Sequence, residues 1–176
     1  MTIDAATAAA IGGRPCVALP LRYHARVTIS LTLQIRRLAS AEGLALPCYM
    51  TPGAAGMDLH AATLEDLLID PGSIVLVPTG LEVAIPAGFE GQVRPRSGLA
   101  VKHGISLPNT PATIDSDYRG EIRVPLINLG REPFVVSRGM RIAQLVVAPV
   151  ARVTWEAVEV LPSTDRGGKG FGHSGV

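Results

Sequence analysis

Hydrophobic and polar residues alternate along the segment 27–36, where valine, isoleucine and leucine occupy every second position and threonine or serine occupies most of the others. This period of two predicts a β-strand with one apolar face. Shorter apolar runs follow, separated by turns that contain proline and glycine, a pattern typical of a sandwich or barrel. The runs predict strands over 54–61, 73–77, 81–85, 91–94, 121–128, 134–136, 143–147 and 152–158. We therefore expect an all-β fold, a distorted jelly-roll or β-barrel-like sandwich.

One short helix interrupts this pattern, over 97–103, with Ser97 as a candidate N-cap. The length of 176 residues fits one domain. We place a β domain at 27–165, after a poorly ordered extension at 1–26. The alanine-rich extension is acid-poor, so a targeting segment is an alternative to a disordered tail or an upstream start. Residues 166–176 hold five glycines and form a Gly-rich C-terminal arm.

Charge is distributed unevenly along the chain. Residues 1–41 carry five arginines and one acid, whereas 42–176 carry eleven basic and fourteen acidic residues. A mildly acidic body argues against a broad nucleic-acid-binding face. Cys16 and Cys48 form no disulfide framework and are typical of a reducing, cytoplasmic compartment. No apolar run reaches the length of about 18 residues that a membrane span needs.

Candidate chemistry concentrates in the stretch 109–121, between two apolar runs. It reads as a β-hairpin with turn residues at its corner. Asp115 and Asp117 are two residues apart, so on an extended strand both would face the same side. Because turns use aspartate for local hydrogen bonds, an isolated pair of this kind is also typical of a solvated corner.

Five segments, read together, resemble the motifs of the trimeric, all-β class of deoxyuridine triphosphate nucleotidohydrolases (dUTPases). They occur in family order between Ala55 and Gly175. They are Ala55-Gly-Met-Asp-Leu, Pro95-Arg-Ser-Gly-Leu-Ala, the stretch 109–121, Arg141-Ile-Ala-Gln-Leu and Arg166-Gly-Gly-Lys-Gly-Phe-Gly-His-Ser-Gly. The resemblance implies that water attacks the α-phosphorus of dUTP and gives dUMP and pyrophosphate. This reaction limits uracil in DNA and supplies dUMP for dTMP synthesis.

The resemblance assigns the nucleoside to the stretch 109–121. Asp115 matches the family's water-activating carboxylate, a general base, and Asp117 would support the hairpin. Tyr118 would lie against the deoxyribose. The uracil edge would be read by Asn109 and by the backbone that includes Thr113 and Ile114. Ala112 stands where the family often has glycine, and we expect the backbone to adapt there.

Phosphate contacts are assigned to three other segments. Arg96, Ser97 and Gly98 lie where a turn opens the helix, so amides and a hydroxyl would meet anionic oxygen. Gln144 would touch a phosphate oxygen or the attacking water. Asp58 would hold the waters of a substrate-bound Mg²⁺ or orient a neighbouring group.

The resemblance also implies a homotrimer that shares its active sites between subunits. The arm 166–176 would close the site of a neighbouring subunit as a lid that excludes water. Its contacts would come from Arg166, Gly170, Phe171, Gly172 and Ser174. In this interpretation Arg166 clamps the γ-phosphate and Phe171 covers the uracil.

Two alternatives differ in function. A dCTP deaminase shares the fold and a similar hairpin, but its hairpin motif differs and its glutamate base has no match here. A catalytically silent nucleotide-binding or interaction protein of the same fold is the second, since fold alone does not establish function. Ammonia release from dCTP would identify the first, and absence of pyrophosphate release from dUTP the second.

Overall fold

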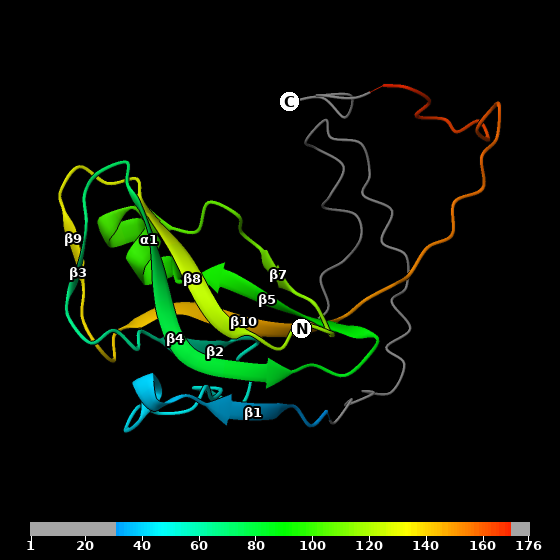
Figure 1. The fold of residues 1–176 in the computed structure, drawn as a ribbon. Helices are drawn as coiled ribbons and strands as arrows, with labels where there is room; N and C mark the ends of the chain where they lie inside the picture. Colours follow the sequence, from blue (N-terminus) through cyan, green and yellow to red (C-terminus); the bar gives the residue numbers. More distant parts are fainter. Residues whose placement is uncertain (1–30, 170–176) are drawn as a thin grey trace, which may run out of the picture. The chain divides into compact units, whose positions relative to one another are not determined.

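The computed structural model describes residues 31–169, and strands dominate this part of the chain (Figure 1). By contacts, the chain divides into a unit at Met1–Thr32, nearly all of it outside the described residues, and a unit at Leu33–Val176. The expected strand at 27–36 is described only from residue 31, and the observed strand begins at Gln34. The elements are β1 (Gln34–Arg37), the 3-10 helix η2 (Ala39–Ala41), β2 (Met57–His60), β3 (Leu67–Ile69), β4 (Ile74–Ala84), β5 (Phe89–Pro95), α1 (Ser97–His103), β6 (Ile105–Ser106), β7 (Ala112–Ile114), β8 (Glu121–Asn128), β9 (Phe134–Val136) and β10 (Arg141–Pro149).

The described residues of the second unit contain two four-stranded sheets and one two-stranded sheet. Their orders are β1-β4-β8-β6, β2-β10-β5-β7 and β3-β9, and neighbouring strands run antiparallel. The inward residues of both larger sheets join one buried cluster, including Val124 of β8 and Leu145 of β10, which are 0% and 2% exposed. The all-β, jelly-roll-like prediction is confirmed, because alternation placed one apolar face of each sheet inward.

The two strands predicted at 73–77 and 81–85 form one continuous strand, β4. The expected breaks at residues 78–80 fall inside β4, where the register with β8 shifts between Pro78 and Glu82. Thr79 donates its hydroxyl to the Ile122 carbonyl at 2.6 Å, and Gly80 adopts a φ of +62°. Proline and glycine therefore mark a bulge in a continuous strand rather than a turn between strands.

The predicted strand at 152–158 is wrong for the isolated chain. These residues have no assigned element and are exposed throughout. A strand needs a hydrogen-bonding neighbour, and none is found for this segment within residues 31–169. Its alternation is real, but no part of the described chain pairs with it.

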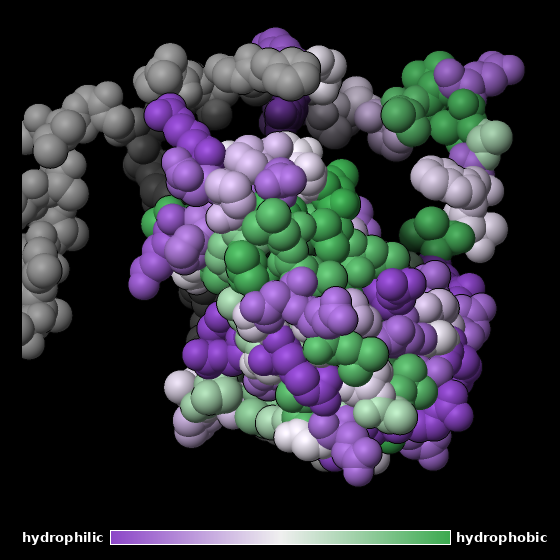
Figure 2. Space-filling view, turned by 60° about the vertical axis from the view of Figure 1, so that its left-hand side comes forward, coloured by the Kyte–Doolittle hydropathy of each residue, from purple (hydrophilic) through white to green (hydrophobic). Residues whose placement is uncertain are grey.

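Some apolar side chains remain on the surface of the strands. Leu68 of β3, Ile74 and Leu76 of β4 and Val135 of β9 are exposed. Figure 2 shows one face of the molecule on which hydrophobic residues gather between hydrophilic ones.

No helix of the described residues is both long enough and apolar enough to cross a membrane.

Candidate active site

The stretch 109–121 links the two larger sheets instead of forming a simple hairpin. Its first strand, β7, pairs with β5, whereas β8 pairs with β4 and β6. The hairpin prediction is therefore wrong in its pairing, because a pattern of apolar runs does not say which sheet each run joins. Ala112 is buried in β7, and no described residue other than glycine has a positive φ, so the backbone accommodates alanine as expected.

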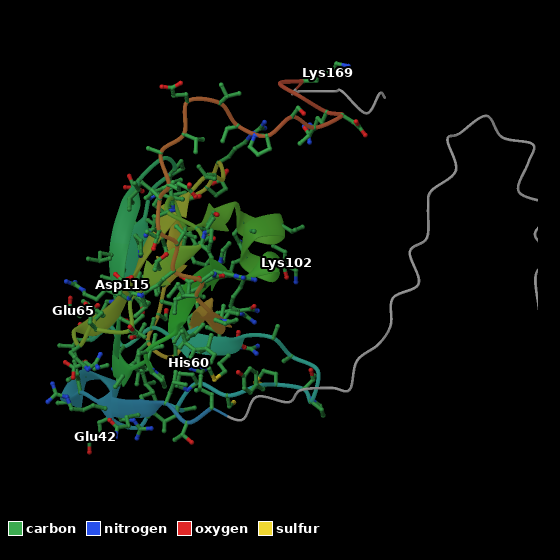
Figure 3. The ribbon with its side chains drawn as sticks, turned by 90° about the vertical axis from the view of Figure 1, so that its right-hand side faces the viewer. Glu42, His60, Glu65, Lys102, Asp115 and Lys169 are labelled. Carbon is green, nitrogen blue, oxygen red and sulfur yellow. The ribbon has the colours of Figure 1, made fainter. Side chains whose placement is uncertain are left out.

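The loop after β7 is closed by its own hydrogen bonds. The Tyr118 amide donates to the Asp115 carbonyl at 3.1 Å, and Arg119 donates to the carbonyls of Ser116 and Tyr118, each at 2.7 Å. The Asp115 side chain is exposed, and Figure 3 labels it on the body of the molecule. No hydrogen bond from residues 31–169 engages the carboxylates of Asp115 or Asp117, so both are open to solvent or to a ligand.

Tyr118 lies over a glycine. Its hydroxyl donates to the Glu121 carbonyl at 3.0 Å, and its side chain is 43% exposed. A Cβ on Gly120 would lie 2.5 Å from the Tyr118 Oη, so any side chain at position 120 would displace the ring. The exposed ring is thus fixed at one edge and free on its other side.

A pocket of about 380 Å³ lies beside this loop, and we call it the acidic pocket. The residues that define it are Glu90, Thr113, Asp115, Asp117 and Arg152. Three carboxylates face one arginine there. Asp115 and Asp117 do share one surface, as expected, although a turn and not an extended strand brings them together.

A second pocket, of about 410 Å³, lies on β2, β5 and β10, and we call it the basic pocket. Its charged and amide side chains are Asp58, Arg94, Arg96, Arg141 and Gln144. Strand register explains the arrangement, because Gln144 of β10 lies opposite Asp58 of β2 on one side and Arg94 of β5 on the other. Three arginines face one carboxylate, so this pocket suits a polyanion.

Asp58 is the buried centre of the basic pocket, with its side chain 8% exposed. Arg96 donates through Nε to Oδ1 at 3.0 Å, and Arg141 donates through Nη1 to Oδ2 at 3.1 Å. A buried carboxylate needs such partners, because an unpaired charge there is costly. The sequence motifs contained Arg141 without assigning it a role, and they missed Arg94.

Ser97 does not cap the helix, so that prediction is wrong. The cap position is Arg96, whose backbone is extended, and it makes no side-chain capping bond. Ser97 is the first helical residue, and both it and Gly98 are exposed beside the basic pocket residue Arg96. Helix capping therefore does not explain the presence of a serine at position 97.

The remaining predicted residues are distributed as follows. Asn109 and Thr113 are exposed and Ile114 is half-buried, all on the 109–121 stretch. Arg166 donates through Nε to the Lys169 carbonyl at 2.9 Å within its own turn. Gly170, Phe171, Gly172 and Ser174 lie outside the described residues. The two pockets share no lining residue, so the chain separates Asp115 from Asp58, Arg96 and Gln144.

Comparison with known proteins gives a consistent result. The sequence profile described as dUTPase matches residues 42–175. The deoxyuridine 5'-triphosphate nucleotidohydrolase of Maricaulis maris is 57% identical over 149 residues, which cover 84% of this chain and 98% of that protein. The enzyme of the same name from Sinorhizobium medicae is 56% identical over 157 residues, covering 88% and 98%.

Solved structures agree with this result. The dUTPase of Staphylococcus bacteriophage 80alpha, with dUpNHpp, has a TM-score of 0.75 at 26% identity and covers 84% of this chain and 100% of that one. A phage phi11 dUTPase variant, described with a structural Mg(II) ion, shares the fold with a TM-score of 0.67 at 23% identity, covering 76% and 100%. The profile match and the identity over most of the chain agree, and this chain belongs to the dUTPase family.

Proposed function

We propose that this chain hydrolyses dUTP to dUMP and pyrophosphate at a site that neighbouring copies build together. Family membership supports the reaction, through the profile match and the 57% identical relative. The observation that carries the shared site is the separation of the candidate base and the phosphate-binding groups into two pockets of opposite charge. As a product, dUMP feeds dTMP synthesis, and removal of dUTP limits uracil in DNA.

The acidic pocket supplies the general base. The Asp115 carboxylate is exposed and accepts no hydrogen bond from residues 31–169, so it can hold and deprotonate the water that attacks the α-phosphorus. Tyr118 offers its exposed ring to the deoxyribose. Asn109 and the backbone at Thr113 and Ile114 read the uracil edge, where cytosine presents the opposite hydrogen-bonding polarity.

The basic pocket receives the phosphate chain. Arg96 and Gln144 line it, and Ser97 with the Gly98 amide lies at the adjoining start of α1. Negative charge develops on the pyrophosphate leaving group, and donors held in place before reaction stabilise that charge. The planar guanidinium of arginine can donate two hydrogen bonds that match the geometry of phosphate oxygens, whereas the lysine ammonium acts as a point charge.

Magnesium use is general among dUTPases. The described residues can be examined for groups that would bind the ion directly. Within 31–169 no group of three or more His, Cys, Asp and Glu residues is placed to hold a metal ion. Both oxygens of Asp58 are bound by guanidinium groups. The chain by itself therefore does not fit a protein-bound Mg²⁺, and we propose that the ion arrives on the triphosphate of dUTP.

A homotrimer accounts for the exposed segment after β10. Val153, Trp155 and Val160 are 73%, 92% and 82% exposed, although their side chains are apolar. Such a segment gains stability when another copy covers it. Opposite charge on the acidic and basic pockets favours a head-to-tail contact, and such contacts form a ring when the rotation between neighbouring copies closes. In such a trimer the arm 166–176 completes the site of a neighbouring subunit. The proposal also places the enzyme in the cytoplasm.

The reaction is tested by pyrophosphate release from dUTP, dCTP, dTTP and UTP with Mg²⁺. We expect release from dUTP and at least about a hundredfold lower kcat/KM with the other three, because a site built for specific hydrogen bonds rejects mismatched analogues strongly. Ammonia release from dCTP would instead identify a deaminase. If dUTP released no pyrophosphate, the chain would be a catalytically silent nucleotide-binding protein.

The shared site is tested by mixing two inactive chains. One carries Asp115→Asn and the other ends after Asp165. Mixed trimers contain some sites with an intact base and an intact arm, so we expect activity to return, measured as pyrophosphate release after the two are refolded together. Each variant alone is the control. Verified mixed trimers that stay inactive would mean that the arm acts on its own subunit.

A further inference from the structure

A further pocket, of about 260 Å³, lies where the end of α1 meets the loop between β8 and β9, and we call it the helix-end pocket. Its walls come from residues 102–104 and 130–134. It shares no lining residue with the acidic or the basic pocket. Figure 3 labels Lys102 of this pocket on α1, well apart from Asp115 of the acidic pocket. The helix-end pocket is therefore distinct from the two pockets proposed for dUTP.

Buried hydrogen bonds fix the shape of the loop 129–133. Asn128 is fully buried, and its Nδ2 donates to the carbonyls of Ile69 at 2.9 Å and Glu132 at 2.8 Å. Its Oδ1 accepts from the Gly130 amide at 2.9 Å. A buried amide group that is hydrogen-bonded at both its oxygen and its nitrogen holds the surrounding backbone in one conformation. The loop is thus shaped before any ligand binds.

Two glycines bring this loop directly against the end of α1. Gly104 follows the helix with a φ of +70°, and its carbonyl accepts from the Leu129 amide at 2.9 Å. A Cβ on Gly130 would lie 2.4 Å from the His103 carbonyl oxygen, and a Cβ on Gly104 would lie 2.5 Å from the Gly130 nitrogen. Backbone therefore packs on backbone, which only glycine permits. The two walls of the pocket are fixed relative to each other.

Several donors on these walls have no partner within residues 31–169. The Lys102 ammonium and the Arg131 guanidinium form no ion pair there, although Glu132 follows Arg131 in the chain. The backbone amides of Arg131 and Glu132 donate to no carbonyl in that part of the chain. His103 adds an imidazole, which carries a proton on at least one ring nitrogen. Phe134 packs against that ring, with the two centroids 5.1 Å apart.

Stabilisation of the helix end explains only part of this set. Basic side chains in the last turn complement the partial negative charge of the helix carbonyls, and Lys102 and His103 occupy that turn. Arg131 does not lie on the helix, yet the loop places it in the same pocket. The cations Lys102 and Arg131 face one carboxylate, that of Glu132. An excess of positive charge favours an anionic ligand.

We propose that the helix-end pocket binds a small phosphate-bearing anion through Arg131, Lys102 and His103. The site does not depend on the proposed function. A guanidinium matches two phosphate oxygens, and an ammonium adds a point charge beside them. The pocket is smaller than the range of about 300–1,000 Å³ usual for drug-sized ligands, so its ligand is inorganic phosphate or a small phosphate monoester. Because the walls are fixed before binding, little conformational entropy is lost when the anion arrives.

Calorimetric titration of the full chain with inorganic phosphate tests the proposal. The variants are Arg131→Met and Lys102→Met, and Arg123→Met, which removes an exposed arginine from β8, is the matched control. We expect each pocket variant to weaken phosphate binding about tenfold, the effect of losing a charged hydrogen bond. Arg123→Met should stay within about twofold of the wild type. Arg131→Lys keeps the charge but loses the fork, so it should recover part of the lost affinity.

The ring signals of His103 in proton NMR spectra locate the bound anion. Phosphate should shift them and leave the signals of His60 unchanged, because His60 lies on β2, opposite Arg141 of the basic pocket. Sodium chloride at equal ionic strength is the control. Glycerol 3-phosphate distinguishes the two sources of the ligand: tighter binding of the ester, still weakened in Arg131→Met, assigns a phosphate monoester. Tighter binding of inorganic phosphate assigns the free ion.

The proposal is wrong if the wild type binds neither compound, or if Arg131→Met and Arg123→Met bind phosphate equally well. It is also wrong if sodium chloride shifts the His103 signals as phosphate does, or if excess dUpNHpp displaces the phosphate. Circular dichroism checks folding, and if one pocket variant fails to fold, the other decides together with the His103 signals. Arg131→Met should hydrolyse dUTP within about twofold of the wild-type rate. If the wild type bound phosphate here but hydrolysed no dUTP, only the proposed function would fail.

Discussion

The basic and acidic pockets are built in different ways. In the basic pocket Asp58, Gln144 and Arg94 lie in one row across three paired strands, and ion pairs fix Asp58 further. In the acidic pocket hydrogen bonds to backbone carbonyls shape the loop after β7. Glu90 accepts a hydrogen bond from Gln92 Nε2 at 2.7 Å, whereas the carboxylates of Asp115 and Asp117 have no hydrogen-bond partner within residues 31–169. One half is locked by its own side chains, whereas the other presents side chains ready for a ligand. We therefore expect variants that displace a fixed side chain to affect the basic pocket most, and variants of the proposed base to affect the acidic pocket most.

Asp115→Asn should break the acidic pocket with the largest effect. The amide keeps the shape of the carboxylate but cannot take a proton from water, so we expect kcat to fall by about 10²- to 10⁴-fold. Affinity for dUpNHpp, measured by calorimetry, should change little. Asp117→Asn is the matched control, with a loss of less than about fivefold. Equal losses in the two variants would show that the carboxylates act as a pair.

Gly56→Ala should weaken the basic pocket without touching a charged group. A Cβ at position 56 would lie 3.1 Å from the Gln144 Oε1 and 3.2 Å from its Cβ, so Gln144 must shift. A misplaced group of this kind costs on the order of tenfold in kcat/KM. Gly53→Ala is the control, because a Cβ at position 53 would have no other atom within 4 Å among the described residues. Unchanged kinetics in Gly56→Ala would remove Gln144 from the reaction.

Gly120→Ala tests the role of the Tyr118 ring, which belongs to the loop beside the acidic pocket. The new Cβ would displace the Tyr118 ring, which lies 2.5 to 3.1 Å from that position. If this ring excludes a 2′-hydroxyl, the preference for dUTP over UTP should fall several-fold, measured by competing the two substrates. Tyr118→Phe keeps the ring and loses only the bond to the Glu121 carbonyl, so its selectivity should remain near the wild-type value.

The smallest effect should come from a pair outside both pockets. Arg36 of β1 and Glu82 of β4 are directly opposite and form an ion pair. The hydrogen bond from Arg36 holds the pKa of Glu82 below its ordinary value of 4.5. A lowered pKa stabilises the fold above about pH 4.5, and this contribution is lost as the pH falls through the lowered pKa.

Arg36→Met should therefore lower Tm by no more than a few degrees at about pH 7 and have less effect near pH 3. Thermal unfolding followed by circular dichroism at both pH values measures this difference. Arg37→Met is the control, and dUTP hydrolysis should be the same in both variants and the wild type. A larger Tm difference at low pH would contradict the assigned direction of the pKa shift.

Alternation predicted most strands and the fold class, because a sheet with one buried face has a sequence period of two. It missed β3, since three residues carry too little pattern, and it divided β4 at a bulge. The motifs predicted Asp115, Arg96 and Gln144 as site residues, and the structure places Asp115 in the acidic pocket and Arg96 and Gln144 in the basic pocket. They did not reveal that Asp58 binds Arg141, because 83 positions separate the two residues and only the fold brings them together.

Trp155 is the chain's one tryptophan, and it lies on the exposed segment after β10, where it is 92% exposed. An indole in water emits at longer wavelength than an indole covered by protein. The natural fluorescence of the chain thus reports whether another copy covers this segment, without any added label. If copies associate as proposed, dilution should shift the emission to longer wavelength as they separate, because association follows mass action. This one residue would thereby provide an optical titration of the proposed subunit assembly.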